Sequence, residues 1–230
     1  MRWRARLVFR VVAWLLLFLG LVKAQNTRGM PVYIHARTIP AVANVPFTGT
    51  EVIENTWTRS EGVPVVDGAW FHVGRDTLGR THREGRYTLL PSDRGQARIN
   101  NIVLDDPATA IRTTLEPSSR TAFLSTFFPP QASEKELAAN EQRETLGVTT
   151  LEGELVEGIR YTRSVPSGSD KPLLITEEVW YSPQLKADIL FKQVDPRYGT
   201  WTMRLTSIQR GEPPADMFQI PEGYRIIAKQ

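Results

Sequence analysis

The sequence predicts a single, mainly β (α+β) domain: a curved antiparallel sheet or partly open barrel, with one or two helices over its concave side. Apolar and polar residues alternate over long stretches, turn signals recur at short intervals, and one segment has helical features. Short strands with frequent turns are typical of antiparallel sheets rather than of alternating strands and helices. The 206 residues after residue 24 also fit one β-rich domain.

The first 24 residues have the features of a secretory signal peptide. Arginines near the start precede an uninterrupted apolar run from Val11 to Val22, and Ala24 is a small residue at the expected cleavage site. The run is shorter than the roughly 20 residues of a membrane-spanning helix, although an uncleaved anchor is the alternative. We therefore expect cleavage after Ala24 and a periplasmic or secreted mature protein.

Charge and cysteine content narrow the function classes. Removal of residues 1–24 leaves 23 basic and 25 acidic residues, a net charge of −2. The basic isoelectric point therefore comes from the leader and gives no reason to expect nucleic acid as a partner. The chain has no cysteine, which excludes disulfides, thiolate metal sites and a lipoprotein anchor. No cofactor and no second membrane-spanning segment are expected.

Residues 25–46 are expected to form an extended leader that can add a short strand, because prolines interrupt them and no apolar period is sustained. Residues 47–230 are then expected to form the single β-rich domain. In its first segment, odd and even positions carry different side chains. The odd positions include Phe47, Glu51, Ile53 and Trp57, and the even positions include Thr48, Thr50, Val52 and Thr56. Threonine, valine and aromatic residues suit the half-buried surface of a sheet.

Turn signals recur along the whole domain. Aspartate accepts backbone hydrogen bonds in turns, proline fixes the next backbone angle and glycine adopts positive φ. The signals are Glu61-Gly62, Asp67-Gly68, Leu78-Gly79, Glu84-Gly85, Arg94-Gly95, Asp106-Pro107 and Asp195-Pro196, the last closing on Gly199. We expect a turn at each of them.

The C-terminal half shows the clearest strand patterns. Trp201, Met203 and Leu205 share one face of a predicted strand, whose other face carries Thr200, Thr202, Arg204 and Thr206. A sheet with one buried and one solvated face has this alternation, so we expect the three apolar residues to be buried. Leu173, Ile175, Val179 and Tyr181 also share one face of a predicted strand, and Ile189 and Phe191 share a face of another. Residues Leu151 to Val165 predict one or two more strands.

One helix is predicted, from Ser133 to Leu146. Ser133 and Glu136 form a capping box, and Gly147 is a suitable stop. Its apolar stripe is thin, so we expect the helix to dock weakly on the surface or across one mouth of the sheet.

No motif of catalytic or metal-binding chemistry stands out. His35, His72 and His82 lack metal-ligand spacing, and no GxSxG elbow or phosphate-binding glycine loop is present. Asp105-Asp106 precedes a proline and is interpreted as a turn. Glu177 and Glu178 would point to opposite faces of a strand, so they cannot share a site. These observations give no support for an enzyme.

Charge is unevenly distributed. Six arginines lie between Arg75 and Arg98, and seven glutamates lie between Glu134 and Glu157. The functional hypothesis is an anion-binding face at Arg80, Arg83 and Arg86, for lipid head groups or a partner. The alternative, which we favour, is that these charges are solvated or neutralise each other across the fold.

The most hydrophobic cluster after the leader contains Phe123, Leu124, Phe127 and Phe128. Packing in the core is the default interpretation. The functional hypothesis is a ligand cavity, because a curved sheet with an apolar concave side under a loose helix can hold an acyl chain.

Several stretches resemble known exported proteins. Residues 150–153, 157–162, 178–183, 195–199 and 210–213 resemble segments of uncharacterised exported proteins of soil bacteria such as the acidobacteria. The ending, with Phe218, Pro221, Gly223 and Tyr224, is similar to the F-x-x-P-x-G-Y close of periplasmic lipoprotein-carrier-like proteins. The resemblance covers residues 75–227 and implies a curved, partly closed antiparallel sheet with helices over its concave side.

The sequence therefore favours a non-catalytic exported binding protein, for a lipid, an acyl chain or a lipidated partner. A structural or interaction module of the cell envelope is the alternative. A hydrolase whose site forms only in three dimensions is a distant third. The expected partner is a hydrophobic ligand or an envelope protein.

Overall fold

The computed structural model describes residues 39–58, 62, 64–88, 99–128, 140–168 and 171–228. The chain divides into two compact units, residues 1–36 and 37–230, and all described residues belong to the second. The predicted signal peptide, His35 and most of the leader lie outside the described residues. Among those described, no helix is long and apolar enough to cross a membrane.

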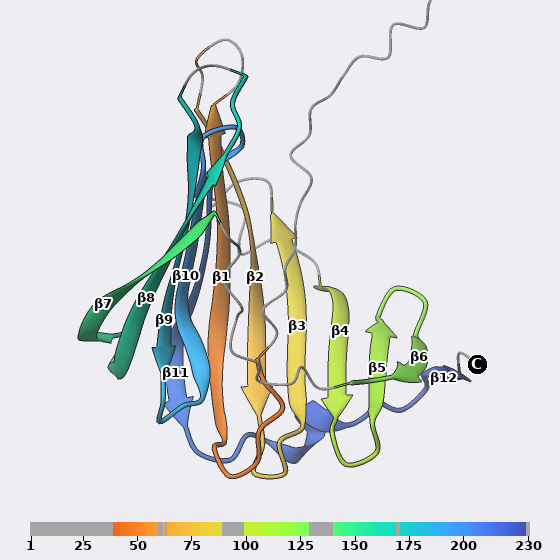
Figure 1. The fold of residues 1–230 in the computed structure, drawn as a ribbon. Coiled ribbons are helices and arrows are strands. Elements are labelled where there is room, and N and C mark those ends of the chain that lie inside the picture. The colour runs from red at the N-terminus through yellow and green to blue at the C-terminus, as the bar shows by residue number, and fades with distance from the viewer. Residues whose placement is uncertain are drawn as a thin grey trace, which may run out of the picture. The chain divides into compact units, whose positions relative to one another are not determined.

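The described residues form one open, curved sheet of twelve strands, which confirms the predicted β fold (Figure 1). Its first half contains β1 (Phe47–Thr58), β2 (Pro64–Arg75), β3 (Thr81–Thr88), β4 (Ile99–Asp106), β5 (Ile111–Glu116) and β6 (Thr121–Thr126). Its second half contains β7 (Glu141–Leu151), β8 (Glu154–Val165), β9 (Leu173–Ser182), β10 (Ala187–Asp195), β11 (Gly199–Arg210) and β12 (Arg225–Ala228).

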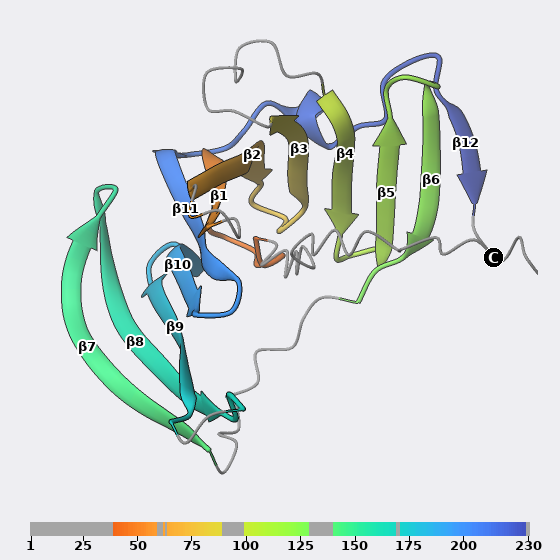
Figure 2. The same cartoon turned by 90° about the horizontal axis from the view of Figure 1, so that it is seen from above.

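The strand order follows from two runs of neighbouring hairpins joined at β1 and β11. The order is β12-β6-β5-β4-β3-β2-β1-β11-β10-β9-β8-β7, so β12 and β7 are the two edges. Every pair among these strands is antiparallel except β12 with β6, where the C-terminal residues run parallel to β6. Figure 2 shows the sheet curving from the edge strand β7, through β11 and β1, to the other edge strand β12.

Directly paired residues lie on the same face of a sheet, so the register defines two faces. The front face carries Glu51 and Ile53 of β1, and their partners Leu205 and Met203 of β11. The back face carries the alternate residues, such as His72 of β2 and its partner Glu84 of β3. The front face is concave and is covered in part by residues 39–46, which we call the N-terminal strap (Figure 2).

The main core lies largely on the front face. Its buried residues are Phe47, Ile53, Phe71, Val73, Val156, Leu185, Ala187, Ile189, Phe191, Trp201, Met203 and Leu205. This confirms the predicted burial of Trp201, Met203 and Leu205, with polar residues alternating along the other face of β11. Phe191 packs edge-on against Trp201, with ring centroids 5.1 Å apart.

A second, smaller core lies on the back face of β4, β5 and β6. Leu104, Leu115 and Ala122 are buried there, and Ile220 and Tyr224 pack against them. Residues 211–224, which we call the C-terminal strap, therefore cover this part of the back face. They contain the short 3-10 helix η2 (Ala215–Phe218).

The predicted helix from Ser133 to Leu146 is wrong over its described part. Residues 133–139 lie outside the described residues, but Glu141–Leu151 is strand β7. The segment is rich in threonine and pairs along β8, and this pairing outweighs a thin helical stripe. Gly147 does not end a helix but sits at positive φ beside an irregularity in the β7–β8 register.

Turn signals were mostly but not always correct. Turns occur at Leu78-Gly79, at Asp106-Pro107 and from Asp195-Pro196 to Gly199, whereas Arg94-Gly95 lies outside the described residues. Asp67-Gly68 and Glu84-Gly85 were wrong, because both lie inside long strands, β2 and β3. Gly68 and Gly85 serve close packing there, since an added Cβ would lie 2.6 Å from the Ile53 carbonyl oxygen and 2.8 Å from the Phe71 ring, respectively.

Candidate functional site

A row of apolar side chains crosses the front face at right angles to the strands. The register pairs Ile159 with Val179, Val179 with Phe191, Phe191 with Met203, Met203 with Ile53, and Ile53 with Ala69. Phe191, Met203 and Ile53 are buried in the main core, whereas Ile159 and Val179 are partly exposed. This apolar row therefore begins in the core and continues onto the accessible part of the concave surface.

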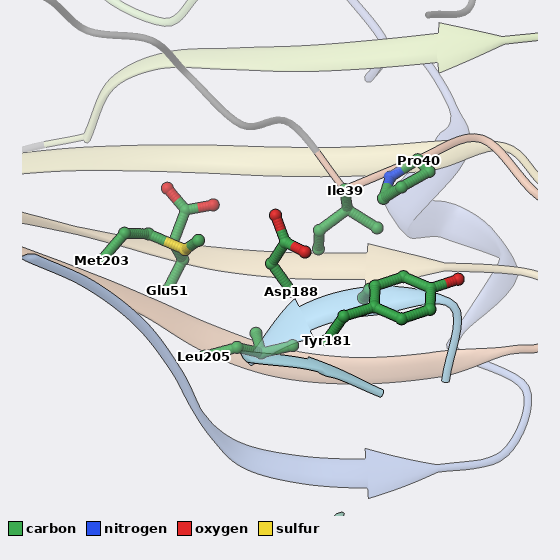
Figure 3. A pocket seen from close by; sticks show the side chains of 8 residues that line it. Ile39, Pro40, Glu51, Tyr181, Asp188, Met203 and Leu205 are labelled. Atoms are coloured by element: carbon green, nitrogen blue, oxygen red, sulfur yellow. The ribbon is translucent and has the colours of Figure 1, made fainter. Parts of the chain in front are cut away.

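A small pocket opens beside the buried part of this row (Figure 3). The concave pocket has a volume of about 70 Å³ and is lined by Ile39, Pro40, Glu51, Tyr181, Ala187, Asp188, Met203 and Leu205. Met203 and Leu205 give it an apolar wall from the sheet, and the N-terminal strap contributes Ile39 and Pro40. Glu51 and Asp188 bring carboxylates to the pocket from β1 and β10, whereas Tyr181 of β9 lines it with its hydroxyl directed away from both carboxylates.

Glu51 is almost fully buried and is neutralised by Arg83. The Arg83 guanidinium donates from Nη2 to Oε1 of Glu51 at 2.6 Å, and its Cζ lies 3.2 Å from the Phe71 ring centroid. The ion pair and the stacking hold the Glu51 carboxylate in place within an apolar surface. A buried carboxylate held in this way is a fixed polar group of the pocket.

Tyr181 and Asp188 are paired across β9 and β10 and form the opposite side of the pocket. The pKa of the Tyr181 hydroxyl is raised, first by burial and then by the negative charge of Asp188, while Arg75 acts in the opposite direction. The hydroxyl therefore stays protonated at neutral pH.

Arg75 fixes the N-terminal strap over the front face. Its guanidinium is fully buried and donates from Nε to Val45 O and from Nη1 to Pro40 O, both at 2.9 Å. Its Nη2 donates to Leu185 O in the β9–β10 turn, and its Cζ lies 5.0 Å from the Phe47 ring centroid. Burial lowers the pKa of Arg75 to about 10, so the group remains charged at neutral pH.

A second, larger groove lies between the C-terminal strap and the adjacent strands. It has a volume of about 230 Å³ and is lined by Arg80, Thr81, Leu104, Asp105, Asp106, Thr109, Ile111, Thr113, Leu124, Phe218 and Ile220. The lining carries charges of both signs, and two of its carboxylates already have partners. Asp105 pairs with Arg112, and Asp106 accepts the backbone N–H of Ala108.

The structure separates the residues of the predicted acyl cavity. Phe123 and Leu124 are successive residues of β6 and lie on opposite faces of it, with Leu124 against the smaller core. Phe127 is buried below Arg112, whose Cζ lies 5.2 Å from its ring centroid. Phe128 is 81% exposed. Leu124 lines the groove under the C-terminal strap.

The structure also separates the predicted anion-binding arginines. Arg80 pairs with Asp76 at 2.6 Å and lies over the Phe218 ring, and Arg83 pairs with Glu51. The side chain of Arg86 lies outside the described residues. Alternation places Arg83 on the front face, whereas Arg80 precedes β3 and lines the groove under the C-terminal strap.

No group of three potential metal ligands occurs in the part of the chain that the structure describes. The ring centroids of His72 and His82 lie 6.2 Å apart on the back face. Nδ1 of His82 lies 2.6 Å from Met217 O, so this nitrogen carries the hydrogen and donates to the C-terminal strap. Glu177 and Glu178 contact different partners, Gln193 and Arg160, as expected for opposite faces.

Sequence reasoning missed Arg75, Tyr181 and Asp188 as members of a site. Tyr181 was assigned to the correct parity, but its partner in β10 depends on a register irregularity between Asp188 and Leu190. The sequence signal for Arg75 was an arginine at the end of an apolar strand, next to the Leu78-Gly79 turn. Such a position is compatible with burial but does not identify the carbonyl groups that Arg75 binds.

No family model and no curated protein matches this chain. Solved structures with a similar fold include an uncharacterised conserved protein from Thermus thermophilus, with a TM-score of 0.47, 11% identity, and coverage of 80% of this chain and 90% of that one. The complex of MucA and MucB from Pseudomonas aeruginosa gives a TM-score of 0.43 and 12% identity. That match covers 78% of this chain and 56% of the other.

A LolA-superfamily protein from Nitrosomonas europaea is also similar, with a TM-score of 0.33 and 11% identity over 76% of this chain and 90% of that one. The structural neighbours thus include lipoprotein-carrier-like proteins of the LolA superfamily. At these identities the likeness concerns the fold.

Proposed function

We propose that this protein is a non-catalytic binding protein outside the cytoplasm, and that its front face binds the acyl chain of a lipid or a lipidated partner. The observation that carries the proposal is the apolar row, which leaves the core at Phe191 and continues as the partly exposed Val179 and Ile159. Apolar area removed from water is the general driving force for binding such a chain.

Pocket size supports a chain that lies along the sheet rather than inside the protein. The concave pocket, at about 70 Å³, is well below the roughly 300–1,000 Å³ that enclose a drug-sized ligand. Only one end of a ligand would enter it, and the rest would cover Val179 and Ile159. The wall residue Tyr181 is two positions from Val179 in β9 and shares its face, so pocket and row are continuous.

The test measures thermal stability with single-chain ligands, with Ile159→Glu as the blocking variant. Dodecanol at about 100 times its Kd should stabilise the native protein by about 2.7 kcal/mol, because it binds the folded state alone. Ile159→Glu should remove most of this gain, because it places a charge on the exposed part of the row. Leu174→Glu is the matched control, since Leu174 is exposed on the back face of β9.

Equal stabilisation of the wild type and of Ile159→Glu would contradict the proposed site. Absence of any gain with alkyl ligands of several lengths would contradict acyl binding itself. An interaction module would then be favoured, because the edge strand β7 is exposed along most of its length, including Val148, and Leu155 is exposed in the adjacent strand β8. An exposed edge strand can pair with a strand of a partner.

We further propose that export includes cleavage after Ala24. N-terminal sequencing of the exported protein should then begin at Gln25. Recovery of the chain with Met1 in a membrane fraction would contradict this.

A further inference from the structure

We propose that the front-face site selects acyl chains by their length, because the N-terminal strap and Glu51 close its inner end. The preferred chain has about twelve carbons, the length that fills the pocket and reaches the edge of the sheet. This inference rests on the proposed function and specifies its ligand class. It combines the volume of the concave pocket, the hydrogen bonds that hold the strap and the strand order.

The inner end of the site is the concave pocket, whose volume limits how much of a chain it holds. The pocket of about 70 Å³ has room for about five water-sized groups, and hence for about five methylenes. Met203 and Leu205 would contact these methylenes from the sheet. Ile39 and Pro40 of the N-terminal strap also line the pocket, so its volume depends on the strap (Figure 3).

Glu51 limits the pocket on the side of β1, the strand next to β11. Its side chain is 2% exposed as a residue of the core surface, and one carboxylate oxygen accepts a hydrogen bond from Arg83 at 2.6 Å. A chain that continued past Glu51 would have to separate this ion pair. Separation would leave a buried charge without its partner, which is strongly unfavourable.

Arg75 holds the strap in its place at the pocket. Its fully buried guanidinium donates to Pro40 O and to Val45 O, both at 2.9 Å, and also to Leu185 O in the β9–β10 turn. One side chain therefore ties the strap to the turn that precedes Ala187, another residue of the pocket. Moving the strap away would leave buried N–H groups without acceptors, so the size of the pocket is fixed.

The outer part of the site is limited by the edge of the sheet. The apolar row passes from Val179 of β9 to Ile159 of β8, whose partner in the edge strand β7 is Thr145. The two steps from β9 to β7 amount to about 10 Å. An extended chain covers this distance with about eight bonds, since three backbone bonds span about 3.5 Å. Together with about five methylenes in the pocket, this gives a chain of about twelve carbons.

The test measures the binding of straight-chain alcohols from octanol to hexadecanol to the full-length exported protein. The Kd of each alcohol, kept below its solubility limit, is obtained from the rise in melting temperature. We expect the Kd to fall about fourfold with each added methylene, the effect of burying one CH2 group. Near dodecanol this fall should stop, because further methylenes remain in water. We call this point the length limit.

Two variants of the pocket should move the length limit in opposite directions. Ile39→Ala enlarges the pocket from the strap, so the limit should move to chains about two carbons longer. Ala187→Val fills part of the pocket from β10, so the limit should move to chains about one or two carbons shorter. Val45→Ala is the matched control and should keep the wild-type limit. Val45 also belongs to the strap and packs against the main core, but it is not among the residues that line the pocket.

The outcomes separate this inference from the proposed function. A Kd that falls steadily up to hexadecanol overturns selection by length, and an unchanged limit in Ile39→Ala overturns the role of the strap. Both results leave acyl binding intact. An equal move of the limit in Val45→Ala also overturns the inference, because loosening of the strap would then be sufficient. No rise in melting temperature with any alcohol overturns acyl binding itself.

Discussion

The front and back faces of this sheet are packed by different principles. The front face buries a large core between twisted strands, and hydrogen bonds from Arg75 fix the N-terminal strap over it. The back face has a smaller hydrophobic core of Leu104, Leu115 and Ala122 under the C-terminal strap. This irregular segment is held by Ile220, Tyr224 and the hydrogen bond from His82 to Met217 O. We therefore expect the front-face core to contribute most of the free energy of unfolding. Shortening a side chain in the back-face core should cost less, because the C-terminal strap can move into the space.

The largest effect is expected for Phe71→Ala in the main core. Phe71 is 1% exposed and lies between the Arg83 guanidinium and Gly85. Its removal should lower the free energy of unfolding by about 3–5 kcal/mol, since a cavity forms and Arg83 loses its stacking partner. Urea denaturation measures this, with the exposed Leu174→Ala as a control that should cost less than about 0.5 kcal/mol. A loss below about 1 kcal/mol would mean that the front-face core is not the main one.

A smaller effect is expected for Leu115→Ala in the back-face core. Leu115 is equally buried, but the C-terminal strap above it has little regular structure and can settle into the space. The loss should lie near the lower end of the usual range, about 2 kcal/mol, because cavity costs fall when a site can collapse. If urea denaturation gave a loss equal to that of Phe71→Ala, the proposed difference between the faces would be wrong.

Two glycines on the back face sharpen the comparison further. A Cβ at Gly158 would lie 2.5 Å from the Trp180 ring, a rigid neighbour within the sheet. A Cβ at Gly74 would lie 2.9 Å from Cε of Met217, the flexible end of a strap side chain. Gly158→Ala should therefore cost about 1–3 kcal/mol of unfolding free energy by overpacking, and Gly74→Ala clearly less. Thermal unfolding of both variants decides this, and the reverse order would show that the strap is the rigid element.

Strict alternation explains which parts of the fold were predictable from sequence. β11 was predicted with its buried face because each residue from Thr200 to Thr206 matches a one-sided strand. β7 was not, because a capping box upstream and a glycine at 147 are typical of a helix, while its pairing with β8 is non-local. Gly68 and Gly85 show the same limit, since close packing between strands and a tight turn both favour glycine.

The candidate site was less predictable than the fold, for a related reason. Glu51, Tyr181 and Asp188 come from β1, β9 and β10, and the position of Asp188 depends on one register irregularity. A single sequence indicates which residues of a strand share a face. It does not indicate which residue of the neighbouring strand each of them pairs with. The aromatic cluster at 123–128 was conspicuous in sequence, yet the structure divides it between both faces and a loop.

The smallest effect is the pH dependence of stability that comes from His82, the residue that donates a hydrogen bond to Met217 O in the C-terminal strap. His82 is 7% exposed, and burial is the main cause that lowers its pKa. The hydrogen bond to Met217 O and the charge of Glu84 oppose that shift, and His72 adds to it. Because the folded pKa lies below the unfolded value of about 6.5, the unfolded chain takes up a proton that the folded protein does not. This contribution to stability is therefore present above about pH 6.5 and is lost as the pH falls towards the folded pKa, with a limiting slope of about 1.4 kcal/mol per pH unit.

His82→Gln should reduce the fall of the unfolding free energy at acidic pH, whereas His72→Gln, at an exposed position, should leave that fall as steep as in the wild type. The free energy of unfolding between pH 5 and 7.5, with hydrogen exchange in residues 211–224, provides the measurement. If the two variants kept the same acid slope as the wild type, His82 would not be the group that couples the strap to pH.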